Sequence, residues 1–204
     1  MAEGRANIRL EAFCDGVFAI AMTLLIIDIK LPAPDDIGNT AELWRALRHM
    51  TPSVLAFVLS FVVILITWVN HHAALRLVHK SSASFIYANG FLLLTVVFIP
   101  FPTALLGEFV WTDRAGPAVV LYNAVLALQS LSWLLLCNAV IAGRLAASDE
   151  GAEKIRANRR SGYGALVLYS ALAVAALRVP MAAAVVTAAS WMFWLVLGIR
   201  MKHA

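Results

Sequence analysis

Side chains that can carry a charge or bind a metal are scarce in the apolar parts of this chain. Asp15 and Asp28 lie near the two ends of the first apolar run, and His71 and His72 are adjacent in the second. A buried charge in a membrane is costly, so it usually faces a bundle interior or water. A helix with acids near both ends is therefore expected at the centre of an assembly. Neighbouring histidines on a helix point about 100° apart, which disfavours a shared metal ion.

Sequence signatures of catalysis are not found. The chain contains no GxSxG, no HExxH and no glycine-rich phosphate loop. Its two cysteines, Cys14 and Cys137, show no CxxC spacing and no histidine at metal-ligand intervals, so we interpret them as reduced and buried. We expect a protein that is not an enzyme and that binds no cofactor.

The composition indicates a membrane protein. Hydrophobic residues make up 62% of the chain, charged residues make up 14%, and the mean hydropathy is +0.82. A soluble domain carries roughly 45–50% apolar and about 25% charged residues. The net charge is +4, but the positive residues lie mostly in short loops between apolar runs. That pattern is typical of membrane topology, so we do not expect a nucleic-acid partner.

Six apolar runs are long enough to cross a bilayer, which takes about 20 residues. They cover about 8–31, 52–75, 85–106, 118–142, 163–179 and 181–199. We predict a polar, basic cytoplasmic loop over 143–162 and an amphipathic stretch on the membrane surface over 43–50. The predicted fold class is an all-α integral membrane protein, with six transmembrane helices in a single domain over 1–204.

Lysine and arginine are distributed unequally between the two predicted sides of the membrane. Eleven fall on one side: Arg5, Arg9, Arg76, Lys80, Arg144, Lys154, Arg156, Arg159, Arg160, Arg200 and Lys202. Five fall on the other side: Lys30, Arg45, Arg48, Arg114 and Arg178. Because cytoplasmic loops carry an excess of these residues, we predict that both termini are cytoplasmic.

The first predicted helix has two distinct faces. Steps of about 100° per residue place Ile20, Leu24 and Ile27 within about 60° of one another, and Asp15 about 140° from Ile20. If Ile20 faces a central axis, Asp15 faces a neighbouring helix. A strip of small residues also permits close helix approach; it consists of Ala12, Gly16, Ala19 and Thr23. In the alternative interpretation, the aliphatic residues make ordinary helix contacts and Asp15 forms a structural ion pair with Arg9.

The start of this helix resembles the transmembrane protein 175 family, the lysosomal potassium channels and their prokaryotic relatives. The family signature is Arg-x-x-x-Phe-Ser-Asp-Gly. It is matched here by Arg9, Phe13, Asp15 and Gly16, with Cys14 where serine is usual.

The second and third apolar runs carry the same resemblance. Trp68 and His71 match the family's Trp-x-x-His, and residues 89–108, with the run Phe-Ile-Pro-Phe-Pro-Thr, are similar to its third helix. The resemblance covers essentially the whole chain.

This resemblance implies a homotetramer in a prokaryotic plasma membrane, with the first helices around an ion pathway. A ring of aliphatic side chains seven residues after the motif Phe forms the constriction, which is Ile20 here. Leu24 and Ile27 follow on the same face, and the threonine layer corresponds to Thr23. The resemblance further implies potassium ions, the lipid bilayer and other copies of the chain as partners.

We interpret the polar motif residues as a scaffold rather than a pore lining. The expected network consists of Arg9, Asp15, Trp68, His71 and Asn89. It would hold the first helix against the second and third, and removing one partner would cost about 1–3 kcal/mol. The Cys14 thiol is a weaker donor than the usual hydroxyl, which leaves one bond of this network open.

The predicted function is a potassium-permeable cation channel whose hydrophobic constriction acts as gate and modest selectivity filter. A ring of isoleucines offers no oxygen ligands, and it dewets and blocks conduction when narrow. The alternative is a proton-conducting channel or a proton-coupled transporter. A side-chain proton relay would need ionisable groups across the membrane, and the first helix has none between Asp15 and Asp28.

Overall fold

The structure, a computed structural model, describes the backbone of residues 2–201 and the side chains of 8–192, 194 and 195. Lys202 and the side chains of Arg5 and Arg200, which enter the predicted charge distribution, lie outside these. The described chain is helical, with a short 3-10 helix η1. The elements are α1 (Ala2–Leu24), η1 (Pro34–Asp36), α2 (Thr40–His49), α3 (Thr51–Arg76), α4 (Ala83–Phe98), α5 (Pro100–Phe109), α6 (Ala115–Ala142), α7 (Asp149–Ala175) and α8 (Pro180–Met201).

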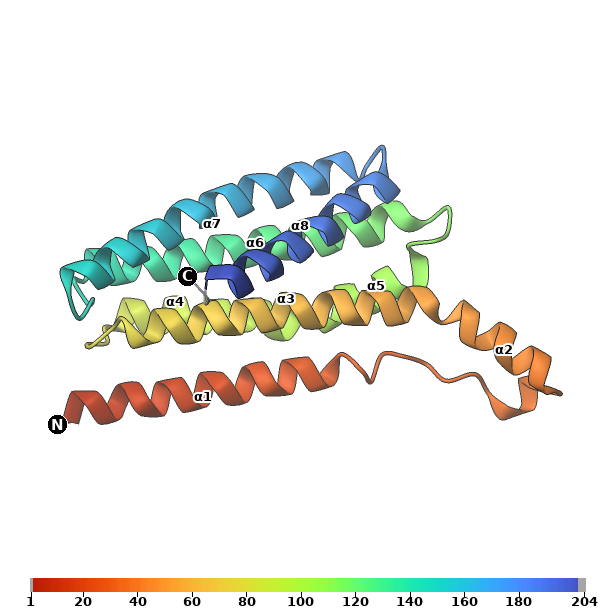
Figure 1. The fold of residues 1–204 in the computed structure, drawn as a ribbon, viewed down its shortest axis with the longest axis horizontal. Coiled ribbons are helices and arrows are strands. Elements are labelled where there is room, and N and C mark those ends of the chain that lie inside the picture. Colours follow the sequence, from red (N-terminus) through yellow and green to blue (C-terminus); the bar gives the residue numbers. More distant parts are fainter. Residues whose placement is uncertain (1, 202–204) are drawn as a thin grey trace.

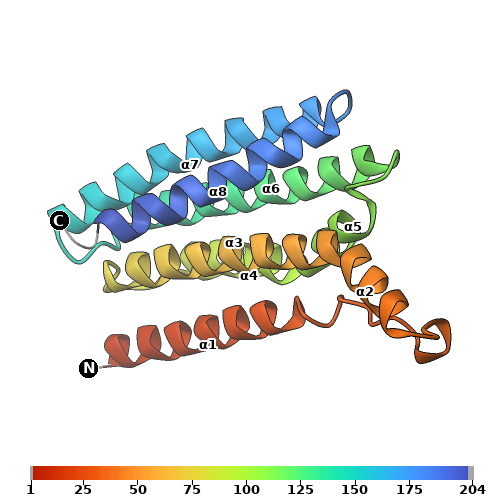
Figure 2. The same cartoon turned by 45° about the vertical axis from the view of Figure 1, so that its right-hand side comes forward.

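The long helices lie side by side in one bundle (Figure 1). Helix α1 runs along one edge, α3 and α4 lie next to it, and α6, α7 and α8 form the opposite side. The same order is visible after rotation (Figure 2), and both ends of the chain lie at the same end of the bundle. Helix α1 therefore has neighbours within the chain on one side only.

Three segments of the described chain are long and apolar enough to cross a membrane. They are Thr51–Arg76, Ala83–Phe109 and Ala115–Ala142. Pro180–Met192 is a shorter apolar stretch. The predicted runs at 52–75 and 118–142 agree with α3 and α6 to within a few residues, because both are uninterrupted apolar sequences.

Helix α1 ends earlier than the predicted boundary at residue 31. The α-helix stops at Leu24, and the chain continues in turns in which the Ile27 amide donates to the Leu24 carbonyl at 3.1 Å. The β-branched residues that follow Leu24 have low helix propensity, and the residue before Pro32 disfavours helix. Ile27 therefore lies beyond α1, so the angular position predicted for it from helical geometry does not apply.

The predicted third helix is broken in the structure. Helix α4 ends at Phe98 and α5 begins at Pro100, with Ile99 between them. Proline has no amide hydrogen and its ring clashes with the carbonyl four residues earlier, so Pro100 and Pro102 both interrupt the hydrogen-bond ladder. Ile99 keeps a helical backbone (φ −54°, ψ −40°), so the interruption is a kink and not a loop.

The predicted cytoplasmic loop over 143–162 is wrong for most of its length. Helix α7 begins at Asp149, where the Ser148 hydroxyl accepts from the Gly151 amide at 3.1 Å. Salt bridges at helical spacing continue the polar turns: Lys154 pairs with Glu150 and Arg156 with Glu153, both at 2.6 Å. A capped, ion-paired polar helix has no hydrophobic periodicity, which is why the sequence reads as a loop.

The connection that remains, 143–148, is bound to the neighbouring α3–α4 connection. The His79 amide donates to the Leu145 carbonyl at 3.1 Å, and the Ala147 amide donates to the Leu77 carbonyl at 2.8 Å. These backbone bonds fix the two turns against each other at the end of the bundle where the termini lie.

The amphipathic stretch predicted over 43–50 lies in helix α2 apart from Met50, which follows the last residue of the helix. Asn39 caps it by accepting from the Glu42 amide, and none of its residues is buried. Leu43, Trp44 and Leu47 are all exposed apolar residues. An amphipathic helix with an uncovered apolar face fits a position at a membrane interface.

Candidate functional site

One face of α1 packs against the rest of the bundle. The buried residues of this face are Cys14, Phe18 and Ala21, and Leu25 directly after the helix continues the same three-to-four spacing; each is at most 1% exposed. They join the main apolar core together with residues of α3, α4 and α6. This spacing gives α1 a single apolar stripe that fixes its rotation about its own axis.

The other face of α1 is uncovered within the chain. The side chain of Phe13 is 61% exposed, that of Ile20 is 59% exposed and that of Leu24 is 37% exposed. The small residues between them are exposed as well: Ala12, Gly16, Ala19 and Thr23. The structure therefore brings the candidate constriction residues Ile20, Leu24 and Thr23 onto one surface. Ile27 is 71% exposed, but it lies in the turn after the helix.

Thr23 uses its hydroxyl within its own helix. Its Oγ1 donates to the Ile20 carbonyl at 2.8 Å, while the side chain remains exposed. The hydroxyl oxygen can still accept a hydrogen bond. Thr23 is thus an exposed polar residue three positions from Ile20 on the uncovered face.

A buried hydrogen-bonded chain joins α1 to α4 and α3. The Asn89 amide nitrogen donates to Cys14 Sγ at 3.1 Å, and His71 Nε2 donates to Asn89 Oδ1 at 2.6 Å. All three side chains are at most 1% exposed. Cys14 therefore acts as an acceptor, so the weak donor strength of a thiol does not matter here.

Asp15 contacts α3 at the edge of the uncovered face. The Trp68 indole Nε1 donates to Asp15 Oδ1 at 2.8 Å. One turn nearer the termini, His72 Nδ1 lies 3.1 Å from Glu11 Oε1, an ion pair when the histidine is protonated. Arg9, which the sequence interpretation places in this network, is exposed and makes no hydrogen bond or ion pair with any described side chain.

The pairing of Glu11 with His72 was missed at the level of sequence. Glu11 and Asp15 are four residues apart on α1, and Trp68 and His72 are four residues apart on α3. In two antiparallel helices this spacing places the pairs on consecutive turns of one interface. The two four-residue intervals can be seen in the sequence. The sequence around them does not specify that α1 and α3 are neighbours, so the pairing cannot be predicted from it.

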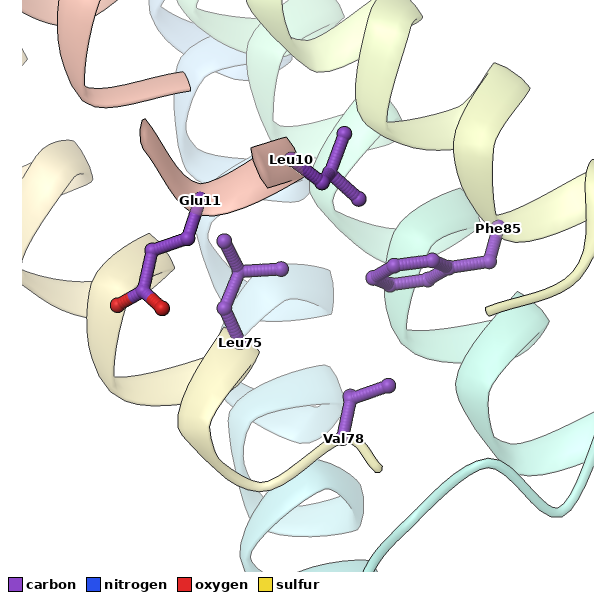
Figure 3. A pocket seen from close by; sticks show the side chains of 5 residues that line it. All are labelled: Leu10, Glu11, Leu75, Val78 and Phe85. Carbon is purple, nitrogen blue, oxygen red and sulfur yellow. The ribbon is translucent and has the colours of Figure 1, made fainter. Parts of the chain in front are cut away.

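A small pocket lies beside this interface, where α1 meets the end of α3 and the start of α4 (Figure 3). Its volume is about 20 Å³, which is room for about one water molecule. Leu10 and Leu75 point toward the Phe85 ring, whereas the Glu11 carboxylate points away from it (Figure 3). Among the described residues, no cluster of three or more His, Cys, Asp or Glu side chains is placed to hold a metal ion.

Comparison with known proteins identifies the family. The family model described as endosomal/lysosomal potassium channel TMEM175 matches residues 9–100. A protein from Chamaesiphon minutus named as a potassium channel is 43% identical over 150 residues, which is 73% of each chain. The chain belongs to the TMEM175 family.

The fold agrees with that of a solved TMEM175 structure. The crystal structure of a lysosomal potassium-selective channel TMEM175 homolog from Chamaesiphon minutus matches with a TM-score of 0.84 at 32% identity. It covers 94% of this chain and 97% of that chain. The human TMEM175 protein is named an endosomal/lysosomal proton channel. It is 39% identical over 79 residues, which are 36% of this chain and 16% of the human protein. TMEM175 proteins are ion channels and not a class of enzyme.

Proposed function

We propose that this protein is a potassium-permeable channel formed by four copies of the chain around their α1 helices. The observation that carries the proposal is the uncovered α1 face, where glycine and alanine alternate with Phe13, Ile20 and Leu24. Small residues permit close approach of helices in a membrane. The potassium channel name of the Chamaesiphon relative agrees with this assignment.

The proposed pathway narrows at Ile20, with Leu24 forming a second aliphatic ring and Thr23 lying between them on the same face. Aliphatic rings supply no ligands, so an ion must shed part of its water or wait until the ring widens. Potassium holds its water less tightly than sodium does, so the neck favours potassium modestly and closes by dewetting. Ile27, in the turn after α1, lines the mouth of the pathway.

The proposed topology has six membrane crossings: α1, α3, α4 with α5, α6, α7 and α8. The termini and the connections 77–82 and 143–148 face the cytoplasm of a prokaryotic cell. Lys80, Arg144 and Lys154 lie near these connections, which agrees with an excess of positive charge on the inner side. Helix α2 lies along the opposite membrane surface. The channel needs no cofactor.

Ile20→Asn tests the constriction. We expect potassium flux into reconstituted vesicles to rise roughly threefold to tenfold with a reduced potassium-to-sodium ratio, because polar side chains keep the neck wet. Val167→Asn is the matched control, since Val167 is similarly exposed on α7 but lies away from α1. Unchanged flux and ion ratios in Ile20→Asn would remove Ile20 from the neck.

Proton conduction is the second candidate function, favoured by the proton channel name of the human relative. Between Asp15 and Asp28 the first helix has no ionisable side chain, so protons would have to move along water in the neck. Vesicles with a pH gradient and no potassium separate the candidates. Rapid collapse of the gradient supports proton conduction, and a stable gradient with potassium flux intact excludes it.

A further inference from the structure

A second cavity lies on the side of α3 that faces away from α1. It is lined by residues of α3, α6, α7 and α8 and by Leu92 of α4, has a volume of about 510 Å³ and is partly open to the outside. Ligand pockets in proteins measure roughly 300–1,000 Å³. The proposed ion pathway does not use this cavity, because Trp68 and His71 face α1 and α4 while Thr67 and Asn70 line the cavity.

The wall of the cavity is aromatic and mostly apolar. Trp133 of α6, Tyr169 of α7 and Trp191 and Trp194 of α8 contribute to it. The rings of Tyr169 and Trp191 are stacked, with centroids 5.7 Å apart and planes 8° from parallel. Flat, rigid ring faces of this kind pack well against hydrocarbon.

Trp191 lines the cavity, but its indole N–H does not open into it. The residue is 8% exposed, and its indole Nε1 is buried without a hydrogen-bond partner within the described part of the chain. The polar groups that an occupant can reach are hydroxyl and amide side chains of the lining, among them Asn70 and Ser161, which are exposed. An occupant with a neutral donor or acceptor can form a hydrogen bond with these groups.

The described residues that line the cavity carry no charge that could balance an ionised ligand. Of the described residues that line it, none is Asp, Glu, Lys, Arg or His, and the polar ones are hydroxyl and amide side chains. The Gln129 amide nitrogen is already engaged, since it donates to Thr67 Oγ1 at 3.1 Å. Burying a charged headgroup here would leave it unpaired, which is strongly unfavourable. The chemistry therefore selects a neutral occupant.

The outer faces of α7 and α8 indicate where the occupant comes from. Val167, Val174 and Val185 are exposed apolar residues on these helices, as expected of surfaces that contact lipid. We infer that the cavity binds a neutral, single-chain membrane amphiphile. Its hydrocarbon packs on the aromatic wall, and its ester or hydroxyl group forms hydrogen bonds with amide and hydroxyl side chains of the lining such as Asn70 and Ser161.

Tryptophan quenching by a brominated monoacylglycerol tests this inference on the full-length channel in unbrominated phosphatidylcholine vesicles. A bound amphiphile should quench tryptophan emission with a saturable dependence on its mole fraction. Ala165→Phe fills the cavity and should abolish the saturable part, whereas Val167→Phe adds similar bulk to the outer face of α7 and should retain it. Quenching in the unmodified channel that rises without saturation would reflect bulk lipid only and would overturn the proposal.

Two further measurements test the chemistry of the occupant. Asn70→Leu keeps the size of the side chain but removes its amide, so we expect roughly threefold to tenfold weaker binding of the monoacylglycerol. A brominated acyl taurine has a sulfonate that stays ionised. Its binding to the unmodified channel should be at least as weak as that of the monoacylglycerol to the variant. Equal binding of the neutral and ionised probes would overturn the assignment to a neutral ligand. Acrylamide dissolved in water provides a further control. If it quenches the tryptophan emission efficiently and the monoacylglycerol does not reduce this quenching, the cavity is filled with water and the proposal is overturned.

Discussion

At the scale of single residues, polar side chains on α1 are used for attachment and apolar ones are left uncovered. Asp15, Cys14 and Glu11 all contact α3 or α4, while Ile20 and Leu24 have no partner helix within the chain. Buried polar groups are strongly directional, so they hold the rotation of α1 more sharply than apolar contacts do. The proposed neck therefore keeps its orientation through residues that do not touch the ion.

Substitution of Cys14 tests whether its sulfur serves as an acceptor. Cys14→Ala leaves the Asn89 amide N–H buried and unpaired, which should reduce the free energy of unfolding by about 1–3 kcal/mol. Cys14→Ser supplies an oxygen acceptor and should keep the stability close to that of the unmodified channel. Thermal melting in detergent measures both variants. Equal melting temperatures for Ala and Ser would show that the bond contributes nothing.

At the scale of elements, α7 carries a polar half and an apolar half in one continuous helix. Its first turns are held by the Ser148 cap and by charge pairs, and Ile155 is their one buried large apolar side chain among the described residues. Such a helix end depends on its cap, because the first backbone amides have no intrahelical partner.

Ser148→Ala should therefore fray the start of α7. We expect a local loss of about 1 kcal/mol, seen as faster amide hydrogen exchange over 149–156 and unchanged exchange in α6. Ser148→Asp provides another capping oxygen and should leave the exchange rates unaltered. Fast exchange over 149–162 in the unmodified protein would contradict the helix itself.

At the scale of the whole molecule, the uncovered apolar residues of α1 differ in character from those of α7 and α8. The α1 face is rich in small residues, which suits another helix, whereas α7 and α8 present branched side chains such as Val167 and Val174, which suit lipid. Protein contacts are therefore expected along one edge of the bundle and lipid contacts along the other.

Gly16 and Gly164 form a matched pair that separates these two surfaces. At both positions a side chain would meet no atom within 4 Å in a single chain, so leucine should be accommodated in the folded subunit at either site. We expect Gly16→Leu to dissociate the tetramer and Gly164→Leu to preserve it, because only Gly16 lies in the proposed subunit contact. Native mass spectrometry counts the subunits. A tetramer retained in Gly16→Leu, or lost in Gly164→Leu, would argue against α1 as the central helix.

The sequence by itself determined the apolar helices and the division of α1 into two faces. Uninterrupted apolar runs set the extent of α3 and α6, and steps of about 100° per residue separated Asp15 from Ile20. Both signals are local, because they depend on residues within a few turns of one helix. The polar half of α7 has no such apolar signal, so its sequence predicts a loop.

Only the tertiary structure decided which polar groups meet. The bonds between Cys14 and Asn89 and between Asp15 and Trp68 join residues 75 and 53 positions apart, and the pairing of Glu11 with His72 depends on which helices are neighbours. The cavity beside Trp191 likewise arises from five helices at once. Contacts of this kind follow from the packing of whole helices, and no local pattern of residues specifies them.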